Sequence, residues 1–127
     1  MKYVSKTIAL KLKALGFKER VLTYFEDDTV KIYQFPTGWD FNTSFSNCVS
    51  RPTLSEVFDW FRQKYRLSIS IEDFLDDYEA KIIEWTLTED RLVHEFSQRT
   101  DISYPNNRFD TWEDAELACL YKLFELK

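Results

Sequence analysis

Glycine is scarce in this chain, because only Gly16 and Gly38 occur among its 127 residues. The common nucleotide-binding loops need several glycines in a short segment, where the backbone approaches a phosphate closely. The sequence therefore excludes these loops. Proline is rare as well, with three residues, and such small numbers exclude a disordered or a collagen-like composition.

Residues that carry metal or nucleophilic chemistry are also few. The two cysteines, Cys48 and Cys119, are too few for a disulfide framework and lack the spacing of a metal site. His94 is the single histidine, and a general base needs an oriented partner or a nucleophile beside it, a geometry that a sequence does not supply. We therefore expect reduced thiols, no bound metal and no cofactor.

Long hydrophobic runs are missing. No apolar stretch approaches the roughly 20 residues that cross a bilayer. Residues 1–6 do not begin a hydrophobic run that ends in a small-residue cleavage site, so no signal peptide is apparent. We expect a cytoplasmic protein that does not enter the membrane.

Apolar residues are nevertheless abundant, at 44% of the chain, and they include 11 Phe, 7 Tyr and 4 Trp. This content and the length of the chain predict a single domain, residues 1–127, with its own hydrophobic core.

The net charge of −5 is divided unevenly along the chain. Residues 1–66 contain 11 Lys and Arg against 7 Asp and Glu, whereas residues 67–127 contain 6 against 15. Binding to nucleic acid depends on neutralisation of phosphates by Lys and Arg, so this distribution argues against a nucleic-acid partner. The acidic half instead suggests a decoy that mimics DNA and occupies a basic protein.

Three segments have the apolar spacing of helices. Residues 5–15 place Ile8, Leu12 and Leu15 on one stripe. Residues 53–66 open with Thr-Leu-Ser-Glu, which is the sequence of a capping box. Residues 111–126 begin with acidic residues, which suit the positive end of a helix dipole.

Between these helices the pattern is typical of strands. Residues 20–35 predict a hairpin that turns at 26–29, and residues 67–71 alternate strictly before a partner strand at 79–88. A third strand is expected near 92–96, and residues 99–108 are expected to form a loop. The predicted fold class is α+β, with antiparallel hairpins packed against about three helices in the order α-β-β-loop-α-β-β-(β)-α.

Residues 36–52 form the longest irregular stretch, and they carry Trp39, Phe41 and Phe45 among small polar residues. A connection of this length is either functional or folded onto the body of the protein. The three rings therefore form a binding surface, or they cover a face of the sheet because large apolar side chains usually become buried.

An acidic cluster at residues 72–79 offers an alternative function. Asp73 closes one strand, and Glu79 and Lys81 lie on its hairpin partner, an arrangement that resembles metal-dependent nucleases. There the carboxylates hold Mg²⁺ and the lysine orients the attacking water. The other interpretation of the cluster is a hairpin connection whose charges are solvated.

The segment Cys48–Arg62, followed by Leu67-Ser68-Ile69, is also suggestive. A cysteine and a Pro-Thr pair precede a helix with a central tryptophan, and an isoleucine-rich strand follows. This pattern resembles small uncharacterised proteins of bacterial prophages and other mobile elements. The resemblance implies a bacterial or phage origin and no particular activity.

These features together predict a small non-enzymatic interaction or accessory protein of a bacterial mobile element. Its expected partner is another protein, and its expected contact surface is formed by Trp39, Phe41 and Phe45. A metal-dependent nuclease that uses Asp73, Glu79 and Lys81 is the alternative.

Overall fold

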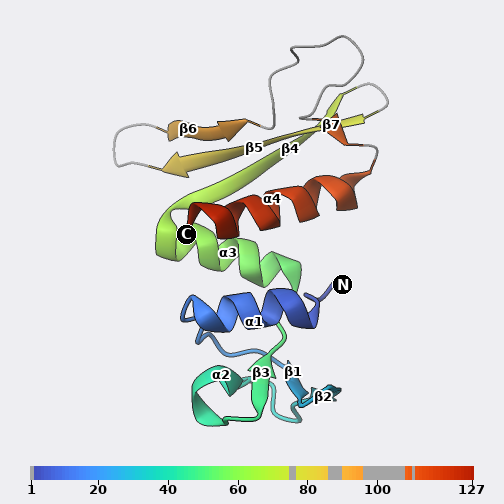
Figure 1. The fold of residues 1–127 in the computed structure, drawn as a ribbon, viewed down its shortest axis with the longest axis vertical. Helices are drawn as coiled ribbons and strands as arrows, with labels where there is room; N and C mark the ends of the chain where they lie inside the picture. Colours follow the sequence, from blue (N-terminus) through green and yellow to red (C-terminus); the bar gives the residue numbers. More distant parts are fainter. Residues whose placement is uncertain (1, 75–76, 86–89, 96–107, 110) are drawn as a thin grey trace. The chain divides into compact units, whose positions relative to one another are not determined.

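The computed structural model describes residues 2–74, 77–85, 90–95, 108–109 and 111–127 (Figure 1). Its helices and antiparallel strands confirm the predicted α+β class. By their internal contacts the residues divide into two compact units, Met1–Val57 and Phe58–Lys127. No helix among the described residues is long and apolar enough to cross a membrane.

The first unit begins with helix α1, Lys6–Ala14, which agrees with the predicted helix at 5–15. The hydroxyl of Ser5 caps it by accepting a hydrogen bond from the Ile8 backbone N–H at 3.3 Å. Ile8, Ala9 and Leu12 are buried along one side of the helix. The apolar stripe in the sequence was therefore sufficient to locate this helix.

A three-stranded antiparallel sheet follows, in the order β2-β1-β3. Strands β1, Thr23–Glu26, and β2, Thr29–Ile32, form the predicted hairpin, with Asp27 in a left-handed conformation at the turn. Strand β3, Cys48–Ser50, pairs with the other edge of β1. This third strand lies inside the stretch 36–52 that the sequence predicted to be irregular.

Two helices flank β3 in the sequence. Helix α2, Phe41–Ser44, is a single turn capped by Asp40, and helix α3 spans Leu54–Tyr65. The predicted capping box of α3 is confirmed. The Thr53 backbone N–H donates to Glu56 Oε1 at 2.8 Å, and the Glu56 backbone N–H donates to Thr53 Oγ1 at 3.2 Å.

The second unit contains the sheet β4-β5-β6, with β7 also paired to β5. The strands are β4, Leu67–Phe74, β5, Asp77–Trp85, β6, Asp90–Glu95, and β7, Arg108–Phe109. The predicted third strand at 92–96 thus corresponds to β6, and most of the predicted loop at 99–108 lies outside the described residues.

Helix α4, Trp112–Leu126, packs along β4 and β5 of this sheet (Figure 1). The Thr111 hydroxyl caps it by accepting a hydrogen bond from the Asp114 backbone N–H at 3.1 Å. The core between sheet and helix contains Ala80, Ala115 and Cys119, all fully buried. The broad apolar face of α4 is therefore covered by a sheet, as expected from its sequence.

Candidate functional site

Helix α2 is fixed to β3 by polar side chains rather than by apolar packing alone. The Asn42 side chain donates from Nδ2 to the Phe17 carbonyl at 2.8 Å and accepts at Oδ1 from the Ser50 backbone N–H at 2.9 Å. Ser50 is fully buried, and its Oγ accepts from the Phe41 backbone N–H at 3.2 Å. These bonds determine where the ring of Phe41 lies.

Asp40 fixes the start of the same turn. Its Oδ1 accepts from the backbone N–H groups of Asn42 at 3.1 Å and Thr43 at 3.4 Å, and its Oδ2 accepts from the Thr43 hydroxyl. A short capped turn can therefore hold two aromatic side chains, Phe41 at its beginning and Phe45 just after its end.

The three rings predicted as a contact surface occupy different environments. Phe41 is only 2% exposed and stacks on Tyr24 of β1, with ring centroids 3.9 Å apart and planes at 15°. Trp39 and Phe45 are 39% and 49% exposed. Each of the two interpretations of this stretch thus describes part of it, because Phe41 covers the sheet while Trp39 and Phe45 remain accessible.

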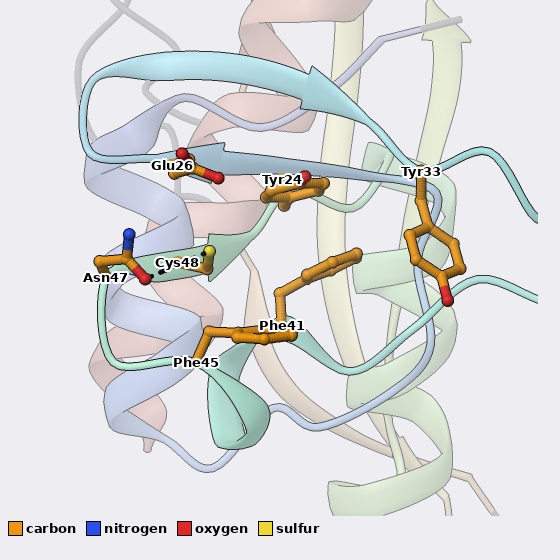
Figure 2. Close-up of a pocket in the computed structure, with 7 residues that line it drawn as sticks. All are labelled: Tyr24, Glu26, Tyr33, Phe41, Phe45, Asn47 and Cys48. Carbon is orange, nitrogen blue, oxygen red and sulfur yellow. Dashed lines mark hydrogen bonds between the residues drawn. The ribbon is translucent and has the colours of Figure 1, made fainter.

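A pocket of about 170 Å³ opens between α2 and one face of the strands β1 and β3 (Figure 2). We call it the aromatic pocket. Its lining residues come from β1, the segment after β2, α2 and its C-terminal flank, and β3: Tyr24, Glu26, Tyr33, Phe41, Phe45, Asn47 and Cys48. Trp39 does not line it but lies beside it, with its ring centroid 6.4 Å from that of Tyr33.

Five of these seven residues, all except Phe41 and Phe45, were not predicted as site residues. Tyr24 and Glu26 alternate along β1, which places both on one side of the strand, and the register sets Glu26 opposite Cys48. Only the alternation in β1 was visible in the sequence. The position of Tyr33 and Asn47 depends on how the later segments fold back.

Two titratable groups of the aromatic pocket, the Cys48 thiol and the Tyr24 phenol, have raised pKa values, which favour their neutral forms. Burial raises the pKa of the Cys48 thiol, and the negative charges of Glu26 and Asp27 raise it further, against an opposing effect of Lys13. Burial and then the charges of Glu26 and Cys48 raise the pKa of the Tyr24 phenol. A protonated thiol is a poor nucleophile, so this lining suits binding better than covalent chemistry.

A second pocket, of about 270 Å³, is lined by Tyr3, Leu22, Thr23, Thr53 and Glu56. Its polar groups already have partners within the protein. Glu56 and Thr53 form the capping box, and the Thr23 hydroxyl donates to the Arg51 carbonyl at 2.6 Å. This pocket is consequently a weaker candidate for a binding site.

The residues of the alternative nuclease site lie on β4 and β5. Glu79 and Lys81 form an ion pair, with Nζ and Oε1 3.8 Å apart, and Glu79 is paired with Glu72 across the strands. Asp73 is paired with Tyr78, and the Asp73 side chain lies outside the described part of the structure. The nuclease function stays a prediction.

The described residues contain no cluster of three or more His, Cys, Asp or Glu side chains that could hold a metal ion. The side chain of His94 and residues 75–76 of the acidic cluster fall outside that set. Cys48 and Cys119 are both buried free thiols, and burial together with Glu116 raises the pKa of Cys119 to about 12.

The chain was compared with protein-family models, curated proteins and solved structures. None of the three comparisons gave a match.

Proposed function

We propose that this protein is a non-enzymatic interaction protein that binds a protein partner through the aromatic pocket of its first unit. The aromatic pocket itself carries this proposal, because four aromatic rings line an open space beside a thiol kept in its protonated form. Aromatic side chains are enriched where proteins bind other proteins. An origin in a bacterial mobile element remains part of the proposal and rests on the resemblance of Cys48–Arg62.

The size of the aromatic pocket favours a side chain of a partner over a larger ligand. Sites for drug-sized molecules occupy roughly 300–1,000 Å³, whereas a cavity of about 150 Å³ holds one benzene molecule. The observed volume of about 170 Å³ fits one side chain. Exposed Trp39 and Phe45 extend the apolar surface around the opening, where more of the partner can pack.

Phe45→Ser is expected to weaken capture of the partner from host-cell extract by at least about tenfold, since truncation of a central aromatic contact typically costs this much. Phe45 is half exposed, so the variant should keep its fold. The measurement is a quantitative pull-down with tagged wild-type and variant proteins, in which the same captured protein is followed by mass spectrometry.

Phe35→Ser is the matched control. Phe35 is 62% exposed and packs beside Tyr33, but it does not line the aromatic pocket. Its substitution should reduce capture by less than about threefold. Equal losses for the two variants, or full capture by Phe45→Ser, would contradict the proposed binding site.

The nuclease alternative makes an opposite prediction about divalent cations. A ligand that binds only the native state raises the melting temperature. For a non-enzymatic protein we expect the same melting temperature, within about 1 °C, with and without millimolar Mg²⁺ or Mn²⁺ at constant ionic strength. A clear increase that disappears in Glu79→Gln would favour the nuclease instead.

A further inference from the structure

The aromatic pocket contains a carboxylate as well as rings. Glu26 lies two residues after Tyr24 on the same side of β1, and both line the pocket (Figure 2). The Glu26 side chain is partly buried. Within the part of the chain that the structure describes, no hydrogen bond or ion pair engages its carboxylate.

Two basic side chains of the first unit, Lys6 and Lys13, bind groups other than Glu26. Lys6 binds Asp28 and the Asp27 carbonyl, and Lys13 donates to the Cys48 carbonyl at 3.1 Å. Lys31 is opposite Tyr24 in the register and hence on the same side of the sheet, but it is exposed and does not line the aromatic pocket. The Glu26 charge is therefore available to a cation that comes from outside the chain.

The ring geometry is compatible with such a cation. The stack of Tyr24 on Phe41 occupies one face of the Tyr24 ring, and the Tyr24 ring also lines the pocket, whereas Phe41 is almost completely buried. Phe45 is inclined by only 26° to Phe41, with centroids 6.3 Å apart, and remains half exposed. The face of an aromatic ring carries partial negative charge and attracts cations within about 6 Å.

The electrostatic influence of Glu26 extends through the aromatic pocket. After burial, its charge is the largest contribution that raises the pKa of Tyr24 on β1 and that of Cys48 on β3. Groups on both neighbouring strands are thus exposed to the same negative potential, and a positive charge placed between them would be stabilised by it.

We propose that the aromatic pocket recognises an alkylammonium group, of the kind that a methylated lysine side chain of the partner carries. This inference rests on the proposed function, because it names the part of the partner that enters the pocket. The carboxylate of Glu26 neutralises the charge, while Tyr24 and Phe45 contact the alkyl groups and the polarised hydrogens around the nitrogen. A pocket lined by aromatic faces and one carboxylate binds a cation more tightly than an uncharged side chain of the same size.

Choline and 3,3-dimethylbutan-1-ol test the proposal, because they have the same shape and differ by one positive charge. Each is titrated into the full-length protein, and binding is followed by NMR shifts of Tyr24, Glu26 and Phe45. We expect choline to bind about tenfold more tightly than the alcohol, which corresponds to a charge contribution of about 1.4 kcal/mol.

Two variants separate the role of Glu26 from a general effect of charge. Glu26→Gln should weaken choline about tenfold and leave the alcohol unchanged. Asp28→Asn removes a charge from an exposed residue of the same hairpin that does not line the pocket, and it should change choline binding less than twofold. Their unliganded spectra show directly whether each variant is folded.

Equal binding of choline and the alcohol, with shifts confined to the aromatic pocket, would overturn the recognition of charge and leave the proposed function standing. An unchanged affinity of Glu26→Gln for choline would overturn it too. If neither probe shifts the pocket resonances, the inference fails, and loss of partner capture in Phe45→Ser then decides the proposed function independently.

Discussion

Phe61→Ala should lower the free energy of unfolding by about 3–5 kcal/mol, the usual effect of removing a buried phenylalanine ring. Phe61 is fully buried on α3. Its ring meets Phe124 of α4 edge to face at 5.4 Å and lies 5.2 Å and 5.7 Å from the rings of Trp60 and Tyr65. Because total stabilities are commonly about 5–15 kcal/mol, this loss is a large fraction of the whole. Urea denaturation followed by circular dichroism measures it.

Two further substitutions control for this result. Phe61→Leu keeps most of the apolar volume and should cost less than about half as much, whereas Gln63→Ala, at an exposed position of α3, should change stability by less than about 0.5 kcal/mol. A loss below about 1 kcal/mol in Phe61→Ala would show that this aromatic cluster does not stabilise the fold.

The parts of the fold that the sequence predicted correctly are those determined by local chemistry. A capping box and an apolar stripe concern residues three or four apart, so α1, α3 and α4 could be located without knowledge of distant contacts. The hairpin of β1 and β2 depends on a turn of short polar residues, which is also local.

Strand β3 was missed because it is only three residues long and its partner β1 lies more than twenty residues earlier. It also contains buried Ser50, a polar residue whose hydroxyl is needed by α2. Glu72, Asp73 and Asp77 were expected in a connection between two strands, but the structure extends β4 and β5 through them. Continuous ladder pairing outweighs the weak strand preference of Asp and Glu.

The difference between locally determined features and those that depend on distant contacts also applies to the candidate site. Phe41 and Phe45 could be predicted as notable because aromatic residues are rare in loops. Tyr24 and Glu26 could not be predicted as site residues. The alternation of a strand divides its residues between two faces of the sheet, and only the packing of α2 shows which face lines the pocket. Sequence reasoning found the residues that approach the sheet and missed those that the sheet itself contributes.

Gly38→Ala should destabilise the protein by about 2–4 kcal/mol, because a Cβ at this position meets both a conformational and a steric obstacle. Gly38 has φ of +68°, in the left-handed region that costs alanine about 1 kcal/mol more than glycine. A Cβ would lie 2.8 Å from the Val21 carbonyl oxygen and 3.0 Å from its carbon. Overpacking of this kind typically costs about 1–3 kcal/mol.

Movement of the Val21 backbone away from the new Cβ would break its hydrogen bonds with Trp39. Val21 N–H donates to the Trp39 carbonyl at 3.0 Å, and Trp39 N–H donates to the Val21 carbonyl at 2.9 Å. Gly38→Asn separates the two costs, since asparagine tolerates the left-handed region but has the same Cβ. Urea denaturation should show a loss of stability for Gly38→Asn that is about 1 kcal/mol smaller than the loss for Gly38→Ala, because the steric cost remains. Near-native stability of Gly38→Asn would assign the whole effect to the backbone angle, and near-native stability of both would contradict the close approach of Gly38 to Val21.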